Sequence, residues 1–186
     1  MPSVNKIAVF IDYDNIRINM RTDPPEKLAE ELGYERLKSW LSEIGEITAV
    51  FVFAPAVTIY ANIEFFYKLG FIPIACPMLP QKSKEKKVLY GIETDEPEDV
   101  PLINKTDEVL IKVAEMIINL TPDITHICIA SGDHHFIPVA ELTKSQGKKV
   151  MIVIANYRPS KELLYFADRD QLTNKRMIHL FNPIRD

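Results

Sequence analysis

The sequence predicts an α/β protein in which a mostly parallel central sheet of about five to six strands carries helices on both faces, as a three-layer sandwich. Short apolar runs of strand length recur along the chain, and amphipathic segments of helical length separate them. This alternation favours parallel strand pairing, because each crossover helix returns the chain to the same end of the sheet. The length of 186 residues suits one domain spanning 1–186.

Apolar runs predict the strands. They are KIAVFI (6–11), EITAVFVFA (46–54), FIPIAC (71–76), ITHICIA (124–130), KKVMIVIA (148–155) and RMIHLF (176–181). Each run is short and nearly continuous, which is typical of a strand that is buried on both faces of a parallel sheet.

The segments between these runs predict helices at 24–45, 58–70, 107–120, 135–147 and 160–167. Apolar residues at helical spacing support them, and Gly70 fits the C′ position that closes a helix. Residues 80–106 break the pattern, because they are basic first, acidic second and interrupted by prolines. We expect an excursion there, with a hairpin from 87–92 to 100–104 over one edge of the site.

Composition narrows the function classes. The formal net charge of −4 excludes a global basic field, so nucleic acid would have to bind at a local patch. The chain start lacks a signal-peptide pattern and no apolar run reaches membrane-spanning length, so we expect a cytoplasmic protein with no membrane partner. Cys76 and Cys128 lie in apolar runs, which predicts buried free thiols.

Acidic residues follow two of the predicted strands. Asp12 and Asp14 come after the first strand, and Asp133 follows Ser131 after ITHICIA. Asp107 lies in the first turn of the helix that leads into that strand. Because the carboxyl ends of parallel strands share one edge, Asp12, Asp107 and Asp133 are expected to converge there.

Close carboxylates repel one another unless a cation lies among them, and hard oxygen ligands suit Mg²⁺ or Mn²⁺. Glu108, beside Asp107, is a further candidate ligand. Each acid alone also has a structural explanation. Asp133 could simply cap a helix, and Asp107 and Glu108 could complement a helix dipole.

Four motifs in order carry a resemblance to a known family. They are FIDYDN with Asp12 and Asn15, NKTDEVL with Lys105 and Asp107, SGDHHFIPVAELTKSQGKKVMIVI, and SKELLYFADRD with Ser160 and Asp168. The sequence resembles the NYN domain family, specifically the LabA-like branch of the PIN-like ribonucleases, from Lys6 to about Leu172. The resemblance implies a PIN-like fold and metal-dependent hydrolysis of RNA.

The resemblance also implies residue roles. Asp12 would be the central metal ligand, and Asp107 and Asp133 would hold the metal directly or through water. Asn15 would orient a ligand or a phosphate, and Lys105 would neutralise phosphate.

One position departs from the family pattern. Its signature has a second Asp where this chain has His135. A neutral imidazole binds Mn²⁺, Zn²⁺ or Fe²⁺ but suits Mg²⁺ poorly. His135 could instead contact phosphate, or the site could have lost catalysis. His134 is expected to face solvent.

An RNA partner needs positive charge and stacking surfaces. Lys82, Lys84, Lys86 and Lys87 form the most concentrated basic run, although a solvated loop explains them equally well. Tyr13 could stack on a base at the mouth of the site, or it could be packed. The sequence leaves a homodimer open.

Three rival functions remain at this level. FIDYDNI resembles the opening Asp-x-Asp of haloacid-dehalogenase-like phosphatases, but the order of the later residues does not fit. The second is a non-catalytic RNA- or protein-binding module on the nuclease fold. His135, in place of the family's second Asp, supports this alternative. The third is a structural or regulatory protein that binds neither metal nor RNA.

Overall fold

A computed structural model describes residues 4–18, 27–80, 102–155 and 159–181. Its elements, in chain order, are β1 (Lys6–Asp12), α1 (Tyr13–Ile18), α2 (Lys27–Ile44), β2 (Glu46–Pro55), α3 (Ala56–Ala61), α4 (Ile63–Lys68), β3 (Ile72–Cys76), β4 (Met78–Pro80), β5 (Leu102–Asn104), α5 (Thr106–Leu120), β6 (His126–Ala130), the 3₁₀ turn η1 (His134–Phe136), α6 (Ile137–Ser145), β7 (Lys149–Ile154), α7 (Lys161–Tyr165) and β8 (Ile178–Leu180).

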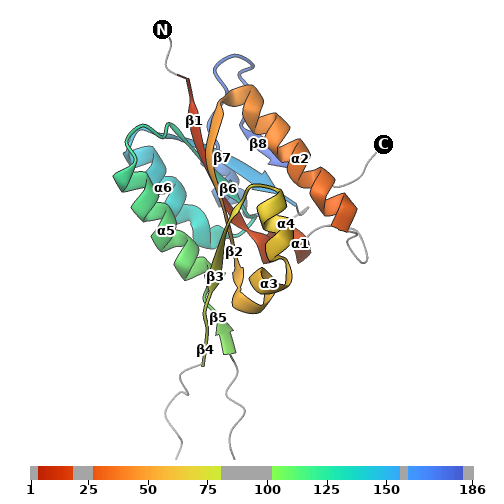
Figure 1. The fold of residues 1–186 in the computed structure, drawn as a ribbon. Helices are drawn as coiled ribbons and strands as arrows, with labels where there is room; N and C mark the ends of the chain where they lie inside the picture. Colours follow the sequence, from red (N-terminus) through yellow and green to blue (C-terminus); the bar gives the residue numbers. More distant parts are fainter. Residues whose placement is uncertain (1–3, 19–26, 81–101, 156–158, 182–186) are drawn as a thin grey trace, which may run out of the picture.

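Six strands form one sheet in the order β3-β2-β1-β6-β7-β8, and every neighbouring pair in it is parallel. This confirms the predicted α/β architecture. The chain starts at the centre of the sheet, moves outward through β2 and β3, and returns to the other side of β1 to form β6 (Figure 1). The direction of winding therefore reverses between β1 and β6, which is where ligands bind in open α/β sheets.

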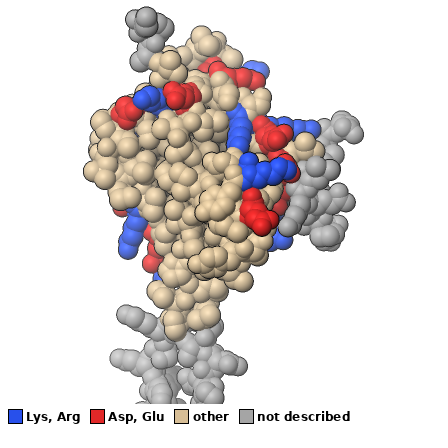
Figure 2. All heavy atoms as spheres, in the orientation of Figure 1, with Lys and Arg blue, Asp and Glu red and all other residues tan. Residues whose placement is uncertain are grey.

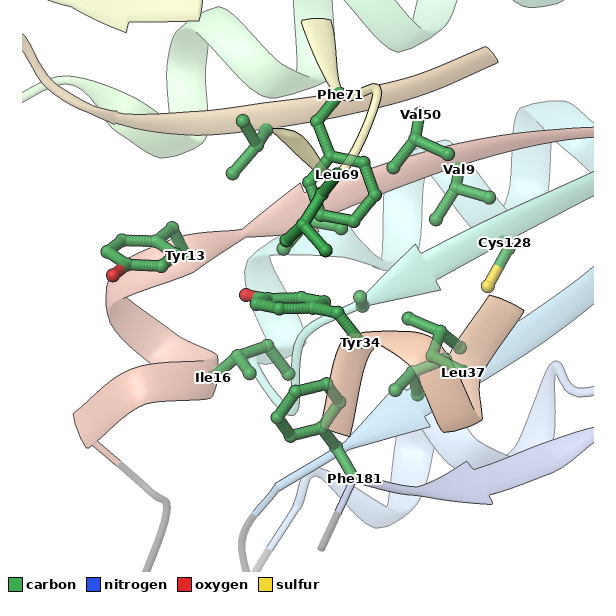
Figure 3. Packing of buried hydrophobic residues seen from close by; sticks show 14 of the residues in the cluster. Val9, Tyr13, Ile16, Tyr34, Leu37, Val50, Leu69, Phe71, Cys128 and Phe181 are labelled. Carbon is green, nitrogen blue, oxygen red and sulfur yellow. The ribbon is translucent and has the colours of Figure 1, made fainter. Parts of the chain in front are cut away.

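Two cores lie on opposite faces of the sheet, because successive side chains of a strand point to opposite sides. Ile7, Val9 and Ile11 of β1 belong to the core beneath α1, α2, α3 and α4. Ala8 and Phe10 belong to the core beneath α5, α6 and α7. Nearly every residue of β1 is apolar because alternate side chains enter the two cores on opposite faces of the sheet. The first core, seen in Figure 3, includes Tyr34 and Phe181 in close packing.

Three helical details differ from the prediction or refine it. Helix α1 follows β1 at once, and its six residues are too few to show a periodicity. The predicted helix at 58–70 is two short helices, because Asn62 leaves helical geometry and its side chain donates to the Thr58 carbonyl oxygen at 2.9 Å. Gly70 has a φ of +71°, which confirms its place just after a helix.

The excursion begins and ends in a two-stranded ribbon. Strand β4 pairs antiparallel with β5, so Leu102–Asn104 is a strand. Among the described residues, the partner of this strand is the short strand that follows β3. The segment 87–92, which was expected to form a hairpin with it, lies outside the described residues. Figure 2 shows a mostly uncharged surface toward the end of the molecule that carries this ribbon.

Two further expectations concern cysteines and the membrane. Cys76 and Cys128 are buried and free, which confirms the prediction. No helix in the described part of the chain combines the length and the apolar character needed to cross a bilayer.

Candidate functional site

Asp12 is the last residue of β1, at the point where the winding of the sheet reverses. Its side chain is almost fully buried, with 6% of the residue exposed. Ser131 Oγ donates to Asp12 Oδ2 at 3.1 Å, and the Asn15 backbone N–H donates to Oδ1 at 3.3 Å. Both carboxylate oxygens are therefore fixed by neighbours at the carboxyl ends of β1 and β6.

A tight turn, Ser131-Gly132-Asp133, ends β6 beside Asp12. Ser131 Oγ also accepts from the Asp133 backbone N–H at 3.2 Å. The Gly132 N–H donates to Asn15 Oδ1 at 3.1 Å, and the Gly132 carbonyl oxygen accepts from the Ser160 N–H at 2.9 Å. The Asn15 side chain thus holds the turn against α1, and Ser160 holds it against α7.

Asp133 also has the capping role considered from the sequence. Its Oδ1 accepts from the His135 backbone N–H at 3.0 Å at the start of η1. The same oxygen lies 2.9 Å from His135 Nδ1. Capping explains the position of this side chain, and the contacts with His134 and His135 all engage its Oδ1.

Asp107 enters from the first turn of α5. The start of this helix is held by Asn104, whose Oδ1 accepts from the Thr106 N–H at 3.0 Å and from its hydroxyl at 2.6 Å. Asp107 Oδ2 lies 3.9 Å from His135 Nδ1, which bridges toward Asp133. The Asn104 and Thr106 contribution was missed, although an Asn two residues before a helix is a recognisable capping signal.

The acids influence one another electrostatically. Burial first, and then the charges of Asp107 and Asp14, raise the pKa of Asp12 to about 7. Burial and the neighbouring Asp133 carboxylate raise the pKa of Asp107, while His135 opposes this. Burial also raises the pKa of Asp14, which is half-buried beside Arg17. Within the described ranges no Lys, Arg or His forms an ion pair with Asp12.

Lys105 and Glu108 form an ion pair with each other. This contact competes with the expected phosphate contact of Lys105 and with metal binding by Glu108. Both roles remain predictions. His134 is exposed, as expected.

Tyr13 is packed and does not face the mouth of the site. It is 1% exposed, and its ring meets Phe66 edge-on, with centroids 5.1 Å apart. Base stacking needs an open ring face, so that expectation for Tyr13 was wrong. Lys82, Lys84, Lys86 and Lys87 lie outside the described residues.

The acids at the switch point and the Ser-Gly-Asp turn are set in a chain whose residues 6–172 match the NYN domain. The chain belongs to the NYN domain family. The family has a PIN-like, nuclease-type fold. Membership of this family argues against the haloacid-dehalogenase-like phosphatase that was considered from the sequence.

One solved structure with the same overall fold is that of a protein of unknown function from Vibrio parahaemolyticus. Its TM-score is 0.61 at 18% identity, and the match covers 90% of this NYN domain chain and 92% of that chain. At this identity the likeness concerns the fold alone. No curated protein matches the sequence.

Proposed function

We propose that this NYN domain is a metal-dependent ribonuclease of the LabA-like branch, which hydrolyses RNA phosphodiester bonds at the carboxyl edge of its sheet. The observation that carries the proposal is the buried Asp12 carboxylate. It lies near Asp107, without an ion pair in the described part of the chain, at the switch point of the fold.

The donor set fits a hard divalent cation. Asp12, Asp107 and Asp133 offer carboxylate oxygens, and their mutual repulsion favours a cation between them. These three residues would hold Mg²⁺ or Mn²⁺, with Glu108 and His135 as further candidates. A bound ion would neutralise phosphate charge and supply an activated water.

The remaining residues of the site position these acids. Ser131 fixes one oxygen of Asp12, and the Asn15 backbone fixes the other. Through its side chain, Asn15 also keeps Gly132, and with it Asp133, beside β1. Such fixed ligands reduce the reorganisation needed when a substrate phosphate arrives.

RNA is the proposed partner because a PIN-like nuclease fold carries the site. The acidic edge would repel phosphate, so binding requires a cation at the acids and positive charge nearby. The lysines at 82, 84, 86 and 87 are the proposed source of that charge.

One observation favours a second candidate, a binding module without catalysis. Asp133 Oδ1 is already contacted by the backbone and ring of His135 and by the His134 ring. If these contacts persist, Asp133 contributes less to a cation, and RNA would bind without being cut.

The test is cleavage of an end-labelled single-stranded RNA in Mg²⁺ and in Mn²⁺ by the wild type and Asp12→Asn. Asp123→Asn is the matched control, because Asp123 is exposed and pairs with Lys6 at the opposite edge of the sheet. We expect Asp12→Asn to cleave the RNA about 100-fold or more slowly than the wild type, and the control to cleave it at the wild-type rate. Equal cleavage by Asp12→Asn would overturn the proposal, and RNA binding without cleavage by the wild type would favour the second candidate.

A further inference from the structure

Two adjacent imidazoles turn back toward one carboxylate at the rim of the site. His134 Nδ1 lies 3.1 Å from Asp133 Oδ1, and His135 Nδ1 lies 2.9 Å from the same oxygen. The two rings are inclined by 32° with centroids 4.2 Å apart. One ligand atom from each of the three residues lies within 4.8 Å of the others. Two nitrogen donors and an oxygen donor are therefore concentrated in a small volume.

This donor set differs in chemistry from the carboxylates around Asp12. Imidazole nitrogen suits Zn²⁺ and related transition metals, whereas Mg²⁺ prefers oxygen ligands. Zn²⁺ holds nitrogen and oxygen at about 2.0–2.1 Å in a tetrahedron, so its ligand atoms lie roughly 3.3 Å apart. The separations from Asp133 to the two histidines are already close to that value.

We propose that Asp133, His134 and His135 form a binding site for a Zn²⁺-class ion, with Asp107 as the fourth ligand. Asp107 Oδ2 is 3.9 Å from His135 Nδ1, and both histidine side chains are more than half exposed. Rotation of these side chains can therefore bring the donors together without disturbing a core. The site rests on the arrangement of the side chains and does not depend on ribonuclease activity.

The rim site differs from the proposed Mg²⁺ or Mn²⁺ position in its ligands, because it includes His134 and leaves out Asp12. Among the residues that the structure describes, Asp12 forms no hydrogen bond or ion pair with either imidazole. The two positions nevertheless share Asp107 and Asp133. A Zn²⁺-class ion at the rim therefore withdraws two carboxylates from Mg²⁺ or Mn²⁺ and lowers the affinity for those ions.

The experiment measures Zn²⁺ binding to the full chain by competition with a chromogenic chelator, with no RNA present. We expect one bound Zn²⁺ in the wild type. His134→Ala and His135→Ala should each weaken Zn²⁺ binding about 10-fold or more. Removing a residue that only hydrogen-bonds to a metal ligand already has an effect of this size, and removing a ligand should have at least as large an effect. His179→Ala is the control, because His179 stacks on Trp40 at the β8 edge of the sheet, and it should bind Zn²⁺ like the wild type.

Asp12→Asn separates the rim site from the ribonuclease proposal. It should keep its Zn²⁺ affinity within about 3-fold while losing Mn²⁺ binding, because Asp12 is no ligand at the rim. Unchanged Zn²⁺ affinity in His134→Ala would overturn the inference, as would loss of Zn²⁺ binding in Asp12→Asn. Neither result depends on whether RNA is cleaved.

Discussion

At the scale of single residues, the burial of Asp12 links stability to pH. Its pKa of about 7 in the folded chain exceeds its ordinary value of 3.8, so the folded state favours the protonated carboxyl. This contribution to stability is fully present below the unfolded pKa and is lost as the pH rises through the folded pKa. Above about pH 7, the ionised group therefore destabilises the metal-free fold.

Asp12→Asn keeps the shape of the carboxyl without its charge. In chelator at pH 8, we expect the variant to be more stable than the wild type by roughly 2–4 kcal/mol, since each pKa unit corresponds to about 1.4 kcal/mol. The difference should shrink toward zero near pH 4. Urea unfolding at the two pH values measures it, and equal or lower stability of the variant at pH 8 would contradict the argument.

His135→Asp tests the departure from the family pattern. The new carboxylate would lie beside Asp133 and Asp107, where His135 now contacts both. Added repulsion should lower metal-free stability, and an added oxygen ligand should raise Mg²⁺ affinity by about 5-fold or more. Calorimetric titration with Mg²⁺ measures the gain, and His135→Asn controls for removal of the ring. A variant that loses stability and gains no Mg²⁺ affinity would end the idea of a substituted ligand.

At the scale of secondary-structure elements, Gly33 shows how closely α2 packs against Phe181, which follows β8. A Cβ at this position would lie 2.7 Å from the ring of Phe181, which is buried beside Tyr34. Gly33→Ala gains about 1 kcal/mol of helix propensity but overpacks the core, at a cost of about 1–3 kcal/mol. We expect a net loss of stability in urea unfolding. Adding Phe181→Leu to Gly33→Ala should relieve the overlap. If Gly33→Ala alone were more stable than the wild type, the ring of Phe181 would have to move aside at little cost.

Lys148 stabilises the end of α5 and the loop that follows. This lysine is 8% exposed, and its ammonium donates to the carbonyl oxygens of Thr121 at 3.0 Å and Ile124 at 2.6 Å. Lys148→Met should lose about 1–3 kcal/mol, because it leaves these acceptors without their donor. The more exposed Lys149→Met is the comparison in thermal unfolding. Similar losses for both variants would indicate that the buried hydrogen bonds of Lys148 add little.

The elements also show where the sequence was sufficient. The runs that became β1 and β6 are apolar at nearly every position because both faces are buried, and their burial confirms this. Strand β4 has three exposed residues, and its pairing with β5 depends on a contact between segments far apart in the chain. Periodicity within one segment carries no information about such a partner.

At the scale of the whole molecule, the net charge of −4 means that RNA must be held locally. Replacing Lys82, Lys84, Lys86 and Lys87 together with Ala should weaken RNA binding and flatten its salt dependence. The slope should fall by roughly 0.7 for each phosphate of a single strand that the lysines no longer neutralise. Fluorescence anisotropy across a salt series measures it, with Lys68→Ala, which removes a surface ion pair with Glu31, as the control. An unchanged slope would indicate that these four lysines do not contact RNA and form only a solvated loop.

The amino-acid sequence alone was enough to predict the parallel sheet and the edge to which Asp12, Asp107 and Asp133 belong. Continuous apolar runs require burial on both faces, and parallel strands carry their carboxyl ends to one edge. The roles of the neighbouring side chains became visible only in the packed fold. Tyr13 is part of the core against Phe66, and Lys105 pairs with Glu108. These contacts depend on which side chains become close neighbours and which stay exposed to solvent after the elements have packed. The spacing of residues along the chain does not determine either.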